Sequence, residues 1–217
     1  MWWDRRGRFA MLHWIAEARS SLLPPAPPGA LAVDLGCGGG LMAPYVARAG
    51  YRHVGVDLSG PALREAAARG VLTVRADVRQ VPLRDGVADV VLAGEILEHV
   101  PDMPQVIAEC ARILRPGGTL VVDTIAATAF GRFTSITLGE RLPGGPPPRL
   151  HDGDLFIDRR QLVGECARHG IDLRLQGLRL SLRGYLLWLA RRRPSATFKP
   201  TRLTAGLFQG VGVKAAA

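Results

Sequence analysis

The stretch Leu31-Ala-Val-Asp-Leu-Gly-Cys-Gly-Gly-Gly-Leu41 decides the fold. It opens with a short, mostly apolar run, Leu31 to Leu35, which is the pattern of a buried parallel strand. Four glycines then fill four of the next five positions, and from Leu41 onward the apolar residues recur at helical spacing. Glycine permits a sharp backbone turn and lets a ligand approach the main chain closely. A strand, a glycine-rich turn and a helix in this order indicate a nucleotide-binding site.

Two kinds of nucleotide ligand compete for such a turn. A dinucleotide fingerprint that starts at Gly36 requires glycine at position 41, which is leucine here. Asp34 precedes the first glycine, where its carboxylate would repel a pyrophosphate but can face an ammonium group. The string D-x-G-C-G-x-G from Asp34 to Gly40 resembles the S-adenosylmethionine site of class I methyltransferases. The turn therefore favours this methyl donor, with Gly36 and Gly38 as expected contacts.

Strand and helix patterns alternate along the rest of the chain. Expected strands cover residues 31–35, 51–57, 71–77, 87–93 and 119–124, with helices over 59–69 and 101–114 among the connections and a last strand pair over 171–182 and 207–213. Connections of this length imply right-handed crossovers between parallel strands. We therefore expect an α/β, Rossmann-like fold with a mostly parallel seven-stranded sheet, helices on both faces and an antiparallel last strand.

Further donor contacts are expected where these strands end. Asp57 ends the second strand, where an acid accepts hydrogen bonds from both ribose hydroxyls. Leu58 follows it and is expected to lie beside the donor, as is Gly94 after the fourth strand. Asp77, together with the backbone of Val78, is expected to meet the adenine amino group.

The string Glu95-Ile-Leu-Glu98-His99 follows the fourth strand directly. On a helix these three polar side chains would share one face, at the edge of the sheet where ligands bind. Two carboxylates and an imidazole suit a divalent cation such as magnesium, so Glu95, Glu98 and His99 are candidate metal ligands, and His99 and Glu95 are candidate catalytic residues. The alternative is a metal-free site in which Glu95 orients the methionine moiety, Glu98 is solvated and His99 alone accepts the proton.

Several strings together resemble the 3-demethylubiquinone O-methyltransferase family. They are Trp2-Trp-Asp-x-x-Gly-Arg-Phe9, the glycine turn, Gly-Val-Asp57, Glu95-Ile-Leu-Glu-His-Val-Pro-Asp102, Leu-Arg-Pro-Gly-Gly118 and His151-Asp152 followed by Phe156. The resemblance implies a methyl-donor contact from Arg19, magnesium at positions 95, 98 and 99, and an acceptor with a long isoprenoid tail. Two regions depart from the family pattern, Thr124–Thr128 and the extra sequence over residues 182–204.

Charge and composition add information about location and partners. Residues 173–217 contain nine Lys and Arg and no Asp or Glu, so they account for the whole net charge of +9. Apolar residues 185–190 beside Arg191-Arg192-Arg193 suit an anionic membrane surface, although a solvated basic face is an equal alternative, and nucleic acid is not expected because few aromatic residues are interleaved. Three scattered cysteines, no secretory signal and no apolar run of about 18 residues lead us to expect a cytoplasmic protein, peripheral on the inner face of the membrane if the tail binds lipid.

A single methyltransferase domain is expected, in four parts. They are an N-terminal helical cap and Pro-rich connector (1–28), a cofactor-binding core (29–124), a lid-like insertion (125–155) and a C-terminal helix, strand pair and basic extension (156–217). The three tryptophans among the first 14 residues either cap the core or wall a substrate pocket, and the Gly/Pro-rich insertion is either a lid over the acceptor or a simple flexible loop.

The sequence thus predicts an S-adenosylmethionine-dependent O-methyltransferase acting on a hydroxyl of a quinone precursor or catechol-like molecule. Within the enzymes, the alternative is O-methylation of another biosynthetic small molecule such as a polyketide, sugar or lipid. Outside the enzymes, a binding protein that kept the fold and lost catalysis is disfavoured, because Asp34, Asp57, Glu95 and His99 are all present.

Overall fold

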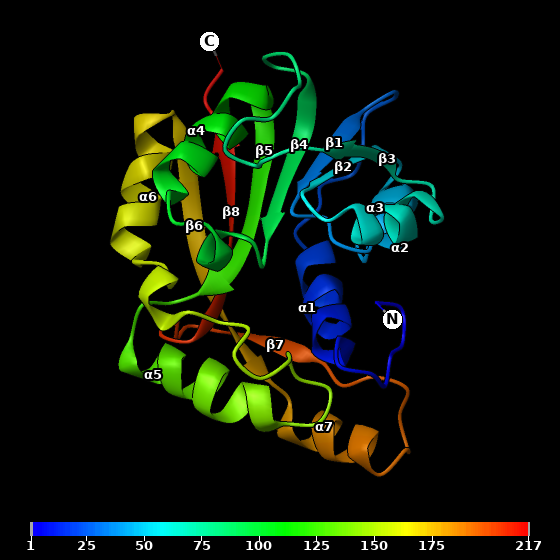
Figure 1. Cartoon of the computed structure of the whole chain (residues 1–217). Coiled ribbons are helices and arrows are strands. Elements are labelled where there is room, and N and C mark those ends of the chain that lie inside the picture. The colour runs from blue at the N-terminus through cyan, green and yellow to red at the C-terminus, as the bar shows by residue number, and fades with distance from the viewer. Residues whose placement is uncertain (1, 217) are drawn as a thin grey trace.

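The computed structural model describes residues 2–216 and is built around one eight-stranded sheet (Figure 1). The strand order is β3-β2-β1-β4-β5-β8-β6-β7. The strands are β1 (Leu31–Leu35), β2 (Arg52–Asp57), β3 (Leu72–Arg75), β4 (Ala88–Gly94), β5 (Leu114–Ile125), β6 (Ile171–Leu180), β7 (Phe198–Thr201) and β8 (Leu207–Lys214). The first five are parallel to one another. This confirms the expected α/β fold, in which the strand sequence runs outward from β1 in both directions.

The helices are shorter than the spans expected from the sequence. They are α1 (Ala10–Ser20), α2 (Ala43–Ala49), α3 (Gly60–Ala67), α4 (Met103–Ile113), α5 (Ala129–Arg132), α6 (Arg159–Arg168) and α7 (Leu182–Leu189), with short η1 (Leu97–His99), η2 (Phe133–Leu138), η3 (Gly139–Arg141) and η4 (Gly153–Leu155). Side chains accept the first free backbone N–H groups of several of them, as Asp102 does for α4, Asp158 for α6 and Ser181 for α7. No helix among residues 2–216 combines the length and the apolar character needed to cross a bilayer.

The antiparallel edge of the sheet differs from the prediction. The expected antiparallel pair is present, since β6 pairs with β8 and β8 lies next to β5, but seven strands were expected and an eighth, β7, pairs with the end of β6. The extra strand comes from residues 182–204, the region that departs from the family pattern, which form α7 and β7. This insertion therefore extends the sheet instead of forming a loop.

Helices cover both faces of the sheet and bury its apolar side chains. One face packs α4 and α6 against inward residues of the central strands such as Val91, Leu120 and Val122. The other face packs α1 and α2 against Ala32, Leu92 and their neighbours. Successive side chains of a strand point to opposite faces of the sheet, so the buried residues divide into two clusters, one on each face.

A cap lies across the carboxyl ends of the parallel strands (Figure 1). It consists of α5, η2 and η3 from the expected lid and α7 with β7 from the C-terminal insertion, lying along the lower end of the molecule in this view. Trp14 of α1 fixes the cap to the core, because its ring packs edge-on against Trp188 of α7 at a centroid distance of 4.9 Å. The residues of the lid-like insertion are therefore folded in helical turns against the strand ends.

Candidate functional site

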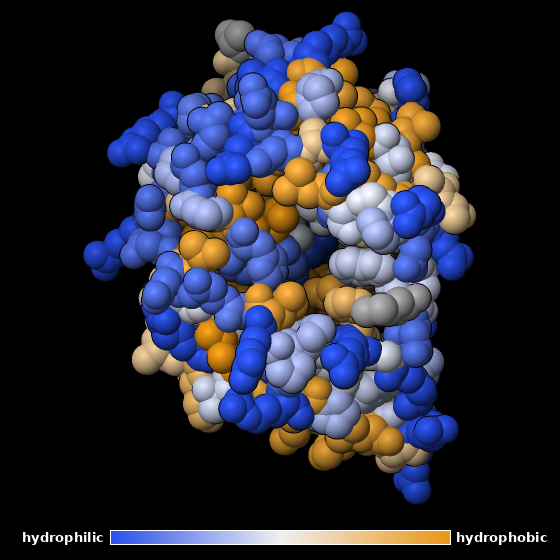
Figure 2. Space-filling view, viewed as in Figure 1, coloured by the Kyte–Doolittle hydropathy of each residue, from blue (hydrophilic) through white to orange (hydrophobic). Residues whose placement is uncertain are grey.

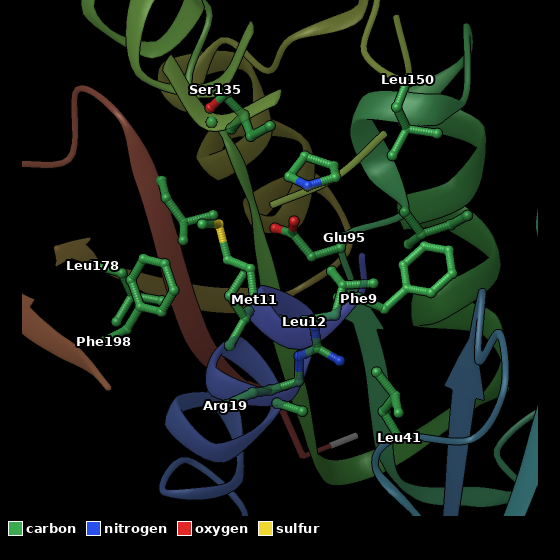
Figure 3. A pocket seen from close by; sticks show the side chains of 18 of the residues that line it. Phe9, Met11, Leu12, Arg19, Leu41, Glu95, Ser135, Leu150, Leu178 and Phe198 are labelled. Atoms are coloured by element: carbon green, nitrogen blue, oxygen red, sulfur yellow. The ribbon is translucent and has the colours of Figure 1, made fainter. Parts of the chain in front are cut away.

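A cavity of about 700 Å³ lies between the carboxyl ends of β1, β2 and β4, helix α1 and the cap. Figure 2 shows the molecule hollowed at this place, with apolar residues around the hollow. In Figure 3 side chains from α1, the cap and the edge strands converge on the cavity, with the Glu95 carboxylate at its centre. Open parallel sheets bind ligands at this end, where strand order reverses.

The glycine turn forms one end of the cavity. Gly36, Gly38 and Gly40 all have positive φ (+70°, +51° and +76°), a conformation that favours glycine. The Asp57 carboxylate holds this turn, because it accepts hydrogen bonds from Gly38 N at 2.9 Å and Ser59 N at 2.7 Å. Asp57 lines the cavity, and each of its oxygens has a further lone pair, so it can accept two more hydrogen bonds, as a ribose diol requires.

The N-terminal segment lies directly over this turn. The Trp2 ring is so close to Gly38 that a Cβ added there would meet it at 2.7 Å, and Trp2 stacks on Phe9 at 4.5 Å. Trp3 donates its ring N–H to Gly39 O at 2.9 Å. Trp2 and Phe9 line the cavity, whereas Trp14 packs in the cap, so the tryptophans serve both roles considered from the sequence.

Arg19 lies at the floor of the cavity in a buried ion pair. Its guanidinium makes a two-point interaction with the Asp123 carboxylate, with Nη2 donating to Oδ1 at 2.7 Å and Nε donating to Oδ2. The guanidinium also covers Gly94, where no side chain would fit. Asp34, which is almost fully buried, lines the same cavity with His53 Nε2 3.5 Å from its carboxylate.

The residues from Glu95 to His99 do not form the expected helical face. Glu95 has positive φ (+52°), and only Leu97–His99 form a short 3₁₀ turn. Glu95 and His99 line the cavity, but Glu98 is fully buried and accepts a hydrogen bond from the Thr124 hydroxyl at 2.7 Å. The prediction of one shared face is wrong because the chain turns immediately after β4, and Glu98 is not solvated either.

The carboxylates of this segment are perturbed by burial. Burial raises the pKa of Glu98 to about 7, and burial together with the neighbouring Glu98 and Asp123 raises the pKa of Glu95 well above its usual value. One oxygen of each carboxylate lacks a hydrogen-bond partner among the described residues. The surroundings of Glu95, at the centre of the cavity, therefore favour its neutral form over its charged form.

The arrangement does not fit the expected metal centre. Within residues 2–216, no group of three or more His, Cys, Asp and Glu side chains is placed to hold a metal ion. Glu95 and Glu98 are close enough to perturb each other, but His99 stacks on His151 at a ring distance of 5.6 Å. The geometric argument for magnesium at these three positions is thus lost.

His151, which the sequence did not nominate as catalytic, lines the cavity, and Glu140 lies behind it as its hydrogen-bond partner. His151 lies between η3 and η4, and its Nδ1 is 3.1 Å from Glu140 Oε1. Both side chains are about 95% buried. The histidine was visible only as part of a family signature, and nothing in the local sequence connects it with Glu140, eleven residues earlier.

The expected donor residues fall into two groups. Those that line the cavity are Arg19, Asp34, Gly36, Gly38, Asp57 and Gly94. The others lie elsewhere: Leu58 is 62% exposed, Val78 is buried in the core, and the Asp77 carboxylate pairs with Arg79 at 2.7 Å. The cavity therefore gathers the residues around the glycine turn and leaves out the third strand.

The apolar end of the cavity comes largely from the cap. Its wall includes Met11, Leu12, Phe130, Leu138, Leu142, Leu150, Leu178, Phe198 and Leu203. Several of these, such as Phe130 and Leu203, are also about half exposed, so the cavity reaches the surface among apolar side chains. The cavity thus joins a polar end at the glycine turn to an apolar chamber, with Glu95, His99 and His151 between them.

The amino-acid sequence is similar to a known protein family and to curated proteins. Residues 33–122 match the family model described as a methyltransferase domain. The chain is 34% identical over 187 residues to the ubiquinone biosynthesis O-methyltransferase of Ralstonia nicotianae, covering 82% of this chain and 79% of that protein. It is 33% identical over 181 residues to the protein of the same name from Methylococcus capsulatus, covering 79% and 76%.

Solved structures share the fold at low sequence identity. A SAM-dependent methyltransferase from Thermotoga maritima superposes with a TM-score of 0.66 at 18% identity, covering 95% of this chain and 93% of the other. The [4+2]-cyclase SpnF superposes with a TM-score of 0.64 at 18% identity, covering 94% and 82%. Because a cyclase is among them, these likenesses establish the architecture and leave the reaction to the site.

Proposed function

Since this chain belongs to the family of the ubiquinone biosynthesis O-methyltransferases, we propose that it transfers a methyl group from S-adenosylmethionine to a hydroxyl oxygen of an aromatic quinone precursor. It is an S-adenosylmethionine-dependent methyltransferase, and the acceptor is the part that we propose. The observation that carries the proposal is the continuity of the cavity from the glycine turn to the apolar chamber. A donor at one end and a hydrophobic acceptor at the other would meet beside Glu95, His99 and His151.

The residues at the glycine turn fit the methyl donor. The turn presents glycine backbone beside the Trp2 ring, Asp57 has free lone pairs for two ribose hydroxyls, and Asp34 offers a carboxylate for an ammonium group. When bound, the donor supplies an electrophilic methyl group on a sulfonium. Arg19 engages Asp123 on two points, so we propose that it shapes the floor beneath the methionine moiety and interacts with the donor only through its remaining N–H groups.

The chamber wall suits an acceptor that is aromatic and carries an apolar substituent. Its side chains are mostly aliphatic and aromatic, with Thr134, Ser135, Arg179 and Thr201 as polar exceptions, and a hydrophobic group enclosed there gains roughly 25 cal/mol per Å² of buried apolar surface. A sugar would leave most of its hydroxyls without partners on such a wall. This favours the quinone precursor over the alternative acceptors, among which a polyketide or lipid stays compatible.

Methyl transfer to a hydroxyl requires the protein to align the acceptor oxygen and to accept its proton. The cavity has to hold the acceptor oxygen in line with the methyl group at near-attack distance. A neutral phenol, with a pKa near 10, also has to lose its proton as the new bond forms. Burial lowers the pKa of both His99 and His151, so both imidazoles are neutral at pH 7 and able to accept that proton. His99 is the acceptor predicted from the sequence.

We include no metal-dependent step, because Glu95, Glu98 and His99 do not form a three-ligand set. The family resemblance still predicts magnesium at these positions, and an activity assay in the presence of chelator tests that prediction. We expect turnover to persist after dialysis against chelator, since the proton can pass to an imidazole without a cation.

The proposal is tested by a panel of acceptors. Purified protein with S-adenosylmethionine is offered a catechol with a short isoprenoid chain, the same catechol without the chain, a sugar and a fatty hydroxy acid, with and without chelator. We expect the chain-bearing catechol to have a kcat/KM at least tenfold above that of the bare catechol, from about 1.4 kcal/mol or more of extra apolar burial. Preferred methylation of the sugar or the fatty acid would contradict the proposed acceptor, and activity lost in chelator and restored by magnesium would contradict the metal-free mechanism.

We further propose that the protein docks on anionic membrane from the cytoplasm. Exposed apolar side chains gather on the cap, on α5 and η2 (Phe130, Phe133, Leu138) and on α7 (Leu182, Leu186, Leu189). Figure 2 shows apolar residues at the lower end of the molecule, where the cap lies. Arg191, Arg192 and Arg193 follow α7 directly and are exposed. Apolar residues beside cations suit an anionic interface, and the cavity reaches the surface at Phe130 and Leu138.

A further inference from the structure

The Glu140 carboxylate in η3 holds the segment that follows it. It is buried and accepts three hydrogen bonds. The donors are the backbone N–H of Arg149 at 2.7 Å, the backbone N–H of His151 at 3.1 Å and the ring Nδ1 of His151, also at 3.1 Å. Burial alone would favour its protonated form, but the hydrogen bonds from His151 and Arg149 outweigh burial and lower the pKa of Glu140 below its usual value. Glu140 is therefore an ionised, accepting partner.

This partner fixes the state of the His151 ring. A carboxylate only accepts hydrogen bonds, so Nδ1 has to carry the proton and Nε2 is left as the basic nitrogen. The ring itself is held between His99, stacked at 5.6 Å and 16°, and Phe156, edge-on at 6.1 Å. His151 lines the cavity, so a buried, oriented imidazole borders the place where the acceptor is expected.

His99 lacks such a partner. Across residues 2–216, no hydrogen bond reaches its ring, and the neighbour it stacks on is the His151 ring. If His99 took a proton, no carboxylate would be hydrogen-bonded to the new cation, although Glu95 lines the same cavity, and a buried charge without such a partner is costly. If His151 took it, the cation would lie against the ionised Glu140, which compensates its charge.

We propose that His151, oriented by Glu140, is the base that accepts the proton of the acceptor hydroxyl. This rests on the proposed function. As the O–CH₃ bond forms and the S–CH₃ bond breaks, the hydroxyl proton passes to Nε2 of His151. Glu140 is a positioning residue, since it acts through the imidazole. Both lie in the lid-like insertion, so this segment supplies a reactive group as well as a cover.

The test uses an acceptor that does not need a base. A nitro group acidifies a catechol enough to ionise it at the assay pH, so methyl transfer to nitrocatechol bypasses the proton acceptor. We expect His151→Gln to lower kcat on catechol by roughly 10²- to 10⁴-fold and on nitrocatechol by less than about tenfold. Glu140→Gln should lower kcat on catechol in the same direction by a smaller factor, and the loss should again shrink on nitrocatechol.

Calorimetry of donor binding shows whether each variant is folded. If Glu140→Gln does not fold, the comparison of the two acceptors with His151→Gln is sufficient to test the proposed base. If His151→Gln lowers kcat equally on catechol and on nitrocatechol, the role of His151 is structural and the proposal is wrong. The proposal is also wrong if His99→Gln lowers kcat on catechol but not on nitrocatechol while His151→Gln lowers neither. A wild-type protein that binds the donor and methylates neither catechol would overturn the proposed function, and this base with it.

Discussion

At the scale of single residues, the residues that line the proposed donor end were easier to infer than those at the proposed acceptor end. Asp34, Gly36, Gly38 and Asp57 could be named because a strand, a glycine turn and a strand-ending acid place them along one edge of the sheet. Glu98 was misjudged because an α-helix was assumed where Glu95 takes positive φ, which turns Glu98 into the interior against Thr124. Glu140 could not be paired with His151 from sequence, because only the folded loop between them brings the two side chains together.

The role of Asp57 gives a prediction at this scale. Asp57→Ala should weaken binding of S-adenosylmethionine, and of its demethylated product, by roughly 10²- to 10⁴-fold, because two hydrogen bonds to a charged group are lost at about 1.5–3 kcal/mol each. Calorimetry measures it, with Asp172→Ala, an exposed acid on β6, as the matched control. Unchanged affinity in Asp57→Ala, or binding of NAD in place of the methyl donor, would contradict the assigned donor end.

At the scale of elements, the regular repeat was predictable and the additions to it were not. Strands β1 to β5 follow from apolar runs bounded by turn residues, and α3, α4 and α6 from capping residues and helical spacing. The strand β7 was missed because its four residues, Phe198–Thr201, contain a proline, which is tolerated only at a sheet edge. The helical turns α5, η2 and η3 were not predicted, because residues 125–155 are rich in glycine and proline and indicated only a lid or a flexible loop.

Helix α7 and the arginines after it give a prediction at this scale. Changing Arg191, Arg192 and Arg193 together to Gln should weaken binding to vesicles that contain anionic phospholipid by roughly 100-fold at low salt, at about 1 kcal/mol for each arginine near the surface. Added salt should reduce the difference by screening.

Vesicle sedimentation measures the binding of both proteins. The matched control changes three exposed arginines elsewhere in the chain, Arg64, Arg84 and Arg174, to Gln. Equal loss in both triple variants, or equal binding of wild type to neutral and anionic vesicles, would contradict docking through α7.

At the scale of the whole molecule, the cavity exists because the cap meets the sheet at the carboxyl ends of its strands. The sheet presents the glycine turn and Asp57, while the cap supplies His151, Glu140 and the apolar wall, and neither part forms the cavity without the other. Buried contacts such as Trp14 against Trp188 hold the cap to α1. The division into four parts of one domain stays a prediction, although the cap shows that residues 125–155 and 182–204 act together.

The most direct measurement follows the methyl group itself. Protein incubated with S-adenosylmethionine carrying a ¹³C-methyl group and an isoprenoid-bearing catechol is analysed by NMR for the position of the label. We expect one new ¹³C signal beside that of the donor, from a methyl group on a ring oxygen of the catechol, appearing at the rate at which the demethylated donor accumulates. Label on carbon or nitrogen, or consumption of the donor without a methylated catechol, would contradict it.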